Sequence, residues 1–186
     1  PDLEAAVDEM VCQCPSCQLT SSQEAPAPVL TEEPWTKPWS KISLDFSSFP
    51  DGRITVVLID SRTKYPVVDV VNSTAYSNIA PVLEKTFPIF GLPEEIKTDN
   101  GPPFQGADFK ELLDHLGIRH RRITPQWPQA NGEAERLMRS LNKALRIAVA
   151  ENADPEYSLE QFLQEYRGTP HCTTKCSPWS LMFQGP

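Results

Sequence analysis

The sequence has no long apolar run, no basic amino-terminal stretch and no surplus of positive charge. Among its 186 residues no stretch of 18 or more is apolar throughout, so we expect no membrane-spanning segment. The first 20 residues carry four acidic side chains and no basic one, which does not fit the basic start of a signal peptide. We therefore expect no secretion signal and no membrane partner.

Histidine is scarce, and the number of cysteines is odd. The five cysteines fall in two clusters, and the three histidines all lie in the second half of the chain: His115, His120 and His171. Without an export signal, this pattern favours reduced thiols or metal ligation over disulfides. Cys14 and Cys17 have zinc-knuckle spacing, but a structural zinc site needs four ligands. They are either half of a zinc site whose other half precedes residue 1, or two ordinary thiols.

The formal net charge of −8 argues against a nucleic-acid partner, but the charge is unevenly distributed. Residues 119–146 contain seven basic and two acidic side chains, a local charge of +5 in an otherwise acidic chain. This basic stretch is either a surface for phosphates or a solvated helix face.

Hydrophobic patterning predicts an α/β chain whose sheet begins with three consecutive strands, the first two joined by a hairpin turn at Asp51-Gly52. Helices and two further strands then alternate. The expected strands are 41–49, 54–59, 67–71, 95–98 and 118–123, and the expected helices are 77–90, 107–116, 132 to about 151 and 158–166. The order predicts a mixed sheet of five strands, a three-strand antiparallel meander plus two, flanked by helices.

The segments around these elements carry their own signals. Residues 19–40 are polar and Pro-rich, which is typical of an extended linker, and we expect Trp35 and Trp39 to dock it on the following domain. Gly117 is expected to end the second helix in the left-handed conformation, and Ser158 to cap the last one. Residues 169–186 are expected to be irregular.

Three carboxylates stand at positions that suit metal-dependent chemistry. Asp45 lies in a strand but points away from its apolar neighbours, and a buried carboxylate needs a partner or a cation. Asp99 follows a strand at its carboxyl end, and Glu135 lies in the first turn of a long helix, with 35 residues between them. Such acids match hard divalent cations, although each alone is also an ordinary turn or helix-end residue. Glu133 competes with Glu135 for the third position, because both cannot face one site.

The helix that carries Glu135 also carries a polar edge. Arg139, Asn142 and Arg146 follow Glu135 at helical spacing and share its face. A cationic edge beside an acidic metal site suits the phosphate backbone of a nucleic acid.

Several motifs resemble the catalytic core of retroviral and retrotransposon integrases, most closely the Ty3/gypsy class. The core motifs are L-D-F (44–46), T-D-N-G-x-x-F (98–104) and N-G-x-x-E-R (131–136). Residues 11–18, V-x-x-C-x-x-C-Q, resemble the second half of the family's zinc-binding domain, and residues 166–183 resemble its C-terminal segment. The similarity spans nearly the whole chain and includes the D,D-35-E spacing that names the family.

The resemblance implies a ribonuclease-H-like fold, Mg²⁺ or Mn²⁺ as cofactor, and an enzyme that trims element DNA ends and transfers them into target DNA. It identifies Glu135 as the third acid, with Asp45 bridging two cations, Asp99 completing one site and Glu135 the other. It implies DNA as partner, a homodimer or higher oligomer, and the nucleus as location. The implied DNA-contacting residues are Gln129, Asn131, Arg136, Arg139, Asn142, Lys143 and Arg146.

The resemblance also divides the chain. Residues 1–18 correspond to the end of the zinc-binding domain, 19–40 to a linker, 41–168 to the catalytic core and 169–186 to its C-terminal segment. Zn²⁺ at Cys14 and Cys17 is expected only where that zinc domain is complete.

Other hypotheses remain open. The missing zinc-domain histidines and the overall acidity allow a domesticated or decayed integrase core that binds nucleic acid or protein without catalysis. A ribonuclease H is a weaker alternative, because it needs a fourth active-site acid and lacks the 35-residue spacing. His171, Cys172 and Cys176 are either metal ligands or tail residues.

Overall fold

A computed structural model describes residues 10, 13, 37–123 and 132–184. The chain divides into two compact units, Pro1–Glu33 and Pro34–Pro186, and nearly all described residues belong to the second. None of the helices in the described part is both long enough and apolar enough to cross a membrane.

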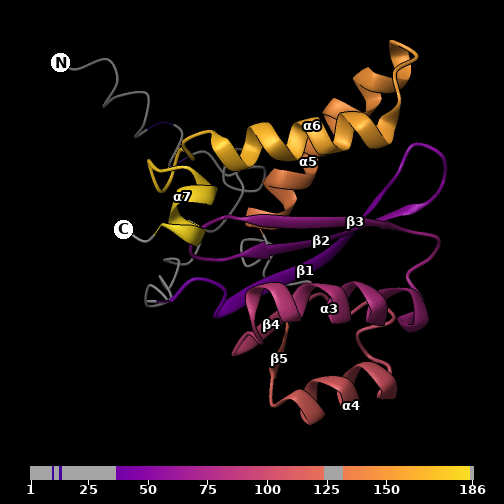
Figure 1. The fold of residues 1–186 in the computed structure, drawn as a ribbon, viewed down its shortest axis with the longest axis vertical. Helices are drawn as coiled ribbons and strands as arrows, with labels where there is room; N and C mark the ends of the chain where they lie inside the picture. Colours follow the sequence, from indigo (N-terminus) through magenta and orange to yellow (C-terminus); the bar gives the residue numbers. More distant parts are fainter. Residues whose placement is uncertain (1–9, 11–12, 14–36, 124–131, 185–186) are drawn as a thin grey trace. The chain divides into compact units, whose positions relative to one another are not determined.

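The second unit is built on a mixed sheet of five strands in the order β3-β2-β1-β4-β5 (Figure 1). Its first three strands form an antiparallel meander, and β4 and β5 extend the sheet in parallel with β1. The strands are β1 (Lys41–Ser48), β2 (Ile54–Asp60), β3 (Pro66–Val71), β4 (Glu95–Thr98) and β5 (Arg119–Arg122). The predicted α/β fold with a three-plus-two sheet is therefore confirmed.

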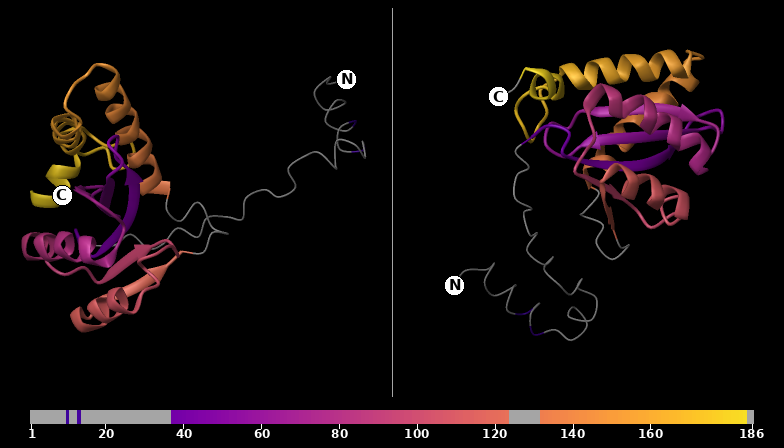
Figure 2. Two further views of the ribbon diagram at one scale, coloured as in Figure 1. Left: turned by 90° about the vertical axis from the view of Figure 1, so that its right-hand side faces the viewer. Right: turned by 60° about the horizontal axis from the view of Figure 1, so that its bottom comes forward.

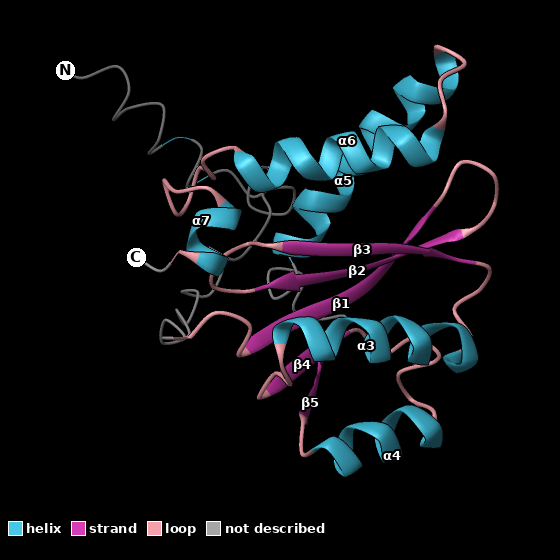
Figure 3. Ribbon diagram, in the orientation of Figure 1, coloured by secondary structure: helices cyan, strands magenta, loops and turns pink. Residues whose placement is uncertain are grey.

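Helices cover both faces of this sheet (Figures 2 and 3). Two of them pack on one face and two on the other, and a short helix follows near the end of the chain. They are α3 (Tyr76–Phe90), α4 (Ala107–Leu116), α5 (Gly132–Ala150), α6 (Pro155–Gly168) and α7 (Pro178–Phe183). Because the sheet alternates its side chains between the two faces, each strand supplies residues to both layers.

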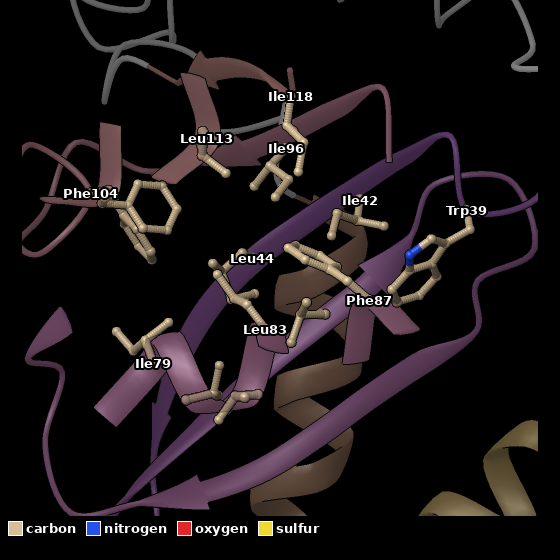
Figure 4. Close-up of a cluster of buried hydrophobic side chains, with 14 residues drawn as sticks. Trp39, Ile42, Leu44, Ile79, Leu83, Phe87, Ile96, Phe104, Leu113 and Ile118 are labelled. Atoms are coloured by element: carbon tan, nitrogen blue, oxygen red, sulfur yellow. The ribbon is translucent and has the colours of Figure 1, made fainter. Parts of the chain in front are cut away.

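The main core lies between the sheet and α3 and α4. Ile42 and Leu44 alternate along β1, and both are fully buried against α3. Figure 4 shows Leu83 and Phe87 of α3, one turn apart, pointing toward them. Full burial of such a side chain stabilises the fold by roughly 1.5–3 kcal/mol, so this face is closed by the hydrophobic effect.

The opposite face is covered by α5 and α6. Leu137 of α5 packs in a cluster with Val57 and Ile59 of β2. Farther along α5, Leu141 and Leu145 pack against Phe49. The helix therefore runs in the same direction as β1, with its first turns beside the middle of the strand and its later turns beside the strand's end.

Several turn and linker predictions are confirmed. Gly52 has a φ of 91° in the β1–β2 hairpin, and Gly117 ends α4 with a φ of 69°, a backbone conformation that glycine adopts at low cost. Trp39 from the predicted linker is 4% exposed and donates its indole N–H to the Gly91 carbonyl at 3.1 Å. Trp35 lies outside the described residues.

Two predictions about the end of the chain are wrong. The last predicted helix begins at Pro155 rather than Ser158, because the Asp154 side chain accepts a hydrogen bond from the Glu156 amide at 2.9 Å and Pro155 suits the first turn. The supposedly irregular tail contains α7, which Ser177 caps by accepting from the Ser180 amide. Both helices start with an acid or serine before proline, a signal that the hydrophobic pattern alone does not use.

Candidate active site

The first two acids lie beside each other because of the register between β1 and β4. These parallel strands pair Lys41 with Glu95 and Ser43 with Lys97, and the same register continued by two residues sets Asp45 level with Asp99. Asp45 is half-buried and Asp99 is exposed. Asp99 thus follows the carboxyl end of β4, level with Asp45 in the second half of the neighbouring parallel strand β1. Open α/β sheets bind ligands at the carboxyl ends of their parallel strands.

The turn after β4 holds the Asp99 carboxylate in place. Its Oδ1 accepts a hydrogen bond from the Gly101 amide at 2.9 Å. A Cβ added to Gly101 would lie 3.1 Å from Oδ2 and 3.2 Å from Oδ1 of Asp99, so glycine allows this close approach. On the backbone side, the Thr98 hydroxyl donates to the Asp99 carbonyl at 2.8 Å and lies 2.9 Å from Nε2 of His120.

An aromatic stack ties the Asp99 loop to the strand that carries Asp45. Phe104, which is 2% exposed, stacks on Phe46 with ring centroids 5.0 Å apart and an interplanar angle of 6°. Phe46 directly follows Asp45, and its amide donates to Asp45 Oδ1 at 2.7 Å. Because offset stacking has preferred geometry, the two acidic segments are held together on the core side of the sheet.

The third acid reaches the same edge on α5. Glu135 is exposed and lies one position from Ala134, which packs in the cluster with Val57, the β2 partner of Asp45. Two turns later, the Asn142 side-chain carbonyl accepts a hydrogen bond from the Ser47 hydroxyl of β1 at 2.9 Å. Glu135 and Asn142 share a helix face, so this bond turns the Glu135 edge of α5 toward β1.

The three acids do not form a closed cage in this conformation. No group of three or more His, Cys, Asp or Glu side chains lies close enough to hold a metal ion within the residues that the structure describes. The donor set itself, three carboxylates on elements that meet at one sheet edge, fits a hard divalent cation. The side chain of Glu133, the competing third acid, lies outside the described residues.

Comparison with known proteins identifies the family. A model described as "Integrase core domain" matches residues 36–128, half of the chain. The chain belongs to this family. An uncharacterized protein of Caenorhabditis elegans is 31% identical over 172 residues, and the Gag-Pol polyprotein of woolly monkey sarcoma virus is 26% identical over 193 residues. These alignments cover 91% and 100% of this integrase core, which spans only 13% and 11% of the two relatives.

Solved structures show the same fold. The catalytic core domain of BIV integrase superposes with a TM-score of 0.65 at 18% identity, covering 78% of this chain and 95% of that one. A structure of the HTLV-2 integrase catalytic core domain in complex with magnesium, in a trimeric form, gives a TM-score of 0.66 at 16% identity and covers 79% and 98%. The ribonuclease-H-like fold implied by the resemblance is therefore confirmed.

The structure separates the predicted DNA-contacting residues into groups. Arg139, Lys143 and Arg146 are exposed on α5 of the integrase core, while Asn142 is half-buried on Ser47. Arg136 is directed elsewhere: its Nη1 donates to the Cys172 sulfur at 3.9 Å, in the segment after α6. Gln129 and Asn131 lie outside the described residues, as do the zinc candidates Cys14 and Cys17.

A second set of basic side chains lies on the sheet itself. In the sequence its arginines belong to the same basic stretch as the α5 edge, residues 119–146. Arg119 and Arg121 of β5 point to the face that carries Asp45, as their ion pairs with Glu95 of β4 show. Lys41 and Lys97 share this face. The alternation of R-H-R-R along a strand is the signal that would have found it, because positions two apart share a face.

The C-terminal His171, Cys172 and Cys176 do not form a metal site in the described structure, and both thiols are free and exposed. The pKa of the Cys172 thiol is lowered, chiefly by its hydrogen bond with Thr173 and then by the positive charges of Arg136 and Lys175. Of the two hypotheses for this cluster, the structure favours tail residues over metal ligands.

Proposed function

We propose that this integrase core is a metal-dependent polynucleotidyl transferase that trims the 3′ ends of an element's DNA and joins them to target DNA. The observation that carries the proposal is the β1–β4 register, whose continuation by two residues sets Asp45 level with Asp99. The hydrogen bond from Ser47 to Asn142 and the packing of Ala134 support a position for Glu135 on the same side of the sheet. Family membership supports the reaction class, since the relatives include viral polyproteins.

Asp45, Asp99 and Glu135 would hold Mg²⁺ or Mn²⁺, and the magnesium complex of the HTLV-2 core supports this choice. Such cations, held by these three acids, would supply activation of an attacking oxygen and stabilisation of the leaving oxygen of a phosphodiester. The family resemblance assigns Asp45 to both cations, Asp99 to one and Glu135 to the other. The Gly101 amide keeps the Asp99 carboxylate oriented for this role.

The basic side chains around the acids would bind the DNA backbone. Arg139 and Arg146 lie on the Glu135 face of α5, and Arg119 and Arg121 lie on the sheet face that carries Asp45, level with Glu95 and Lys97 of β4. Each phosphate contact releases counterions, so binding should weaken steeply as salt rises. This local charge explains how a chain with a net charge of −8 can take DNA as a partner.

Four further parts of the proposal rest on the family resemblance. The core works as a homodimer or a higher oligomer, and it acts in the nucleus. Zinc binds at Cys14 and Cys17 where a complete zinc-binding domain is present. The catalytic core spans residues 41–168, after the linker 19–40, and 169–186 complete it.

Disintegration of a branched DNA substrate tests the proposal. The folded chain is incubated with Mn²⁺ and the branched substrate, and wild type is compared with Glu135→Gln. We expect strand joining by wild type and its loss in the variant, because the substitution removes one carboxylate charge from the cation site. Glu151→Gln is the matched control, since this exposed glutamate follows the far end of the same helix.

Two results would count against the proposal. If wild type binds Mn²⁺ and DNA but joins no strands, the non-catalytic alternative, a domesticated or decayed core, is favoured. If Glu135→Gln keeps wild-type activity, Glu135 is not the third acid and Glu133 becomes the candidate.

A further inference from the structure

A cavity lies behind α5, on the side away from the Glu135 edge. It has a volume of about 200 Å³, which is room for a small ligand or several water molecules. Four parts of the chain form it: the β2–β3 turn, the first turns of α5, the end of α6 and the segment after it. The described residues that line it are Ile59, Lys64, Arg136, Leu137, Ser140, Tyr166, His171 and Thr173.

The polar lining of this cavity consists of hydrogen-bond donors. Lys64 and Arg136 carry positive charge, and Arg136 presents a guanidinium with five N–H groups. His171 accepts a hydrogen bond on Nδ1 from the Thr173 amide at 3.2 Å, which leaves the ring proton on Nε2. Tyr166 adds a hydroxyl, and no carboxylate occurs among the described lining residues.

Two of these polar groups, Lys64 and His171, are held in place by contacts within the fold. Lys64 is 7% exposed and has a left-handed φ of 62°, and its ammonium donates to the Ser61 carbonyl in the same turn. The ring of His171 packs edge-on against Tyr166 with centroids 6.2 Å apart. Groups fixed in this way lose little side-chain entropy when a ligand binds.

The neighbouring thiol reports the electrostatics of the cavity. Cys172 accepts a long hydrogen bond from Arg136, and the charges of Arg136 and Lys175 help to lower its pKa. The hydrogen bond with Thr173 contributes most to that shift, and the share of Arg136 shows that a lining residue of the cavity favours a nearby anion.

We propose that this cavity is an oxyanion site of the phosphate class, in which Arg136, Lys64 and His171 bind phosphate oxygens. A planar guanidinium, an ammonium and an imidazole that line one cavity match a tetrahedral oxyanion. The ligand is either free phosphate or a phosphodiester of a nucleic acid. The site is separate from the three acids, so it does not depend on the proposed catalytic function.

Because the chain has only three histidines, the signals of His171 can be followed individually by NMR. The chain is labelled with ¹⁵N-histidine and titrated with sodium phosphate at constant ionic strength, with sodium chloride as balance. We expect the imidazole signals of His171 to shift and saturate, while those of His115 and His120 on and near α4 stay constant. Equal, unsaturated drift of all three would overturn the proposal.

Two variants of α5 separate a built site from general attraction. Arg136→Gln should weaken phosphate binding by about tenfold or more, because it removes a charged hydrogen-bond donor. Arg139→Gln removes the same charge from the same helix. Arg139 lies about one turn farther along α5 and on the side of Glu135, so this variant should leave the His171 titration unchanged. Equal weakening in both variants would contradict the site.

A second readout follows from Cys172. Bound phosphate shares the Arg136 charge, so the rate at which iodoacetamide alkylates Cys172 should fall several-fold as phosphate saturates, measured by peptide mapping. An alkylation rate that phosphate leaves unchanged would contradict ligand contact with Arg136.

A third experiment distinguishes free phosphate from a nucleic-acid phosphodiester as the ligand. A short single-stranded oligodeoxynucleotide replaces inorganic phosphate in the ¹⁵N-histidine titration. A saturating His171 shift that phosphate competes away identifies a nucleic-acid phosphodiester as ligand. A His171 response to phosphate alone identifies the free anion, and a response to neither probe overturns the proposal.

Discussion

The two ends of the β1–β4 strand pair carry carboxylates in opposite situations. At the amino end, Glu95 is 3% exposed and lies 3.2 Å from Lys41 Nζ and 2.7 Å from Arg119 Nε. At the carboxyl end, Asp45 is half-buried and Asp99 is exposed, level with each other. Both ends use the same two strands and the same face of the sheet.

The contrast shows what distinguishes a structural acid from a candidate catalytic one. Glu95 is surrounded by cations of the chain itself, and the buried charge is thereby stabilised. At the other end the register sets Asp45 level with Asp99, and their carboxylate oxygens are the kind of ligand that a divalent cation takes. We infer that the first end belongs to the scaffold and the second to the site, and variants at and between the two ends test this difference.

The largest effect is expected at the carboxyl end. Asp99→Asn should lower the strand-joining rate about a thousandfold, since a catalytic cation supplies several kcal/mol of transition-state stabilisation. The thermal midpoint without metal should stay the same or rise, because one of two neighbouring charges is removed. Activity is measured with Mn²⁺ and branched DNA. A large loss of stability in Asp99→Asn would assign Asp99 to the scaffold instead.

The amino end should respond in stability rather than in chemistry. Glu95→Gln takes the carboxylate away from Lys41, which is 2% exposed, and should cost about 3 kcal/mol. This is the low end for breaking a buried pair, because Arg119 and Arg121 remain in contact with water. Urea unfolding measures it, with the exposed Glu94→Gln as control. An unchanged midpoint for Glu95→Gln would remove the contrast between the two ends.

The basic side chains between the ends should matter for DNA affinity. Arg121→Gln should reduce affinity several-fold and lower the salt dependence of log K by about one unit, as expected for one lost phosphate contact. Arg122 is the matched control, because it is the next residue of β5 and points to the opposite face. Fluorescence anisotropy at several salt concentrations measures both. Equal effects at Arg121 and Arg122 would argue against a directed DNA surface on the sheet.

The smallest effect concerns pH. Burial, and then the charge of Arg122, lower the pKa of His120, which packs on Phe109 behind the Asp99 strand. As the pH falls, His120 is protonated in the unfolded chain before it is protonated in the folded one. The free energy of unfolding therefore has its full value above about pH 6.5 and decreases as the pH drops below it. The loss should be small, because water screens the half-buried ring.

His120→Asn should flatten this part of the stability profile, measured by urea unfolding between neutral and mildly acidic pH. The control His115→Asn, at an exposed position, should leave the stability profile unchanged. A profile that both variants leave as steep as wild type would place the acid sensitivity elsewhere.

Much of the fold could be read from local pattern. The alternation of Ile42, Leu44 and Phe46 predicted both a strand and the outward direction of Asp45, and the hydrophobic core confirms it. Helix ends were harder, because the start of α6 depends on the Asp154 cap and not on apolar spacing. Short α7 has too few residues for a period to show, and its burial comes from contact with the rest of the fold.

The three acids and their spacing could be identified from the sequence alone, because a motif is recognised by residue types and their separation along the chain. Only the tertiary structure decided which residues share a surface. The β1–β4 register sets Asp45 level with Asp99, while on α5 Arg139 is exposed on the Glu135 side and Arg136 contacts Cys172 and lines the cavity behind the helix. Arg136 and Arg139 point about 60° apart on the helix, so two arginines three residues apart are divided between different surfaces once the helix is packed.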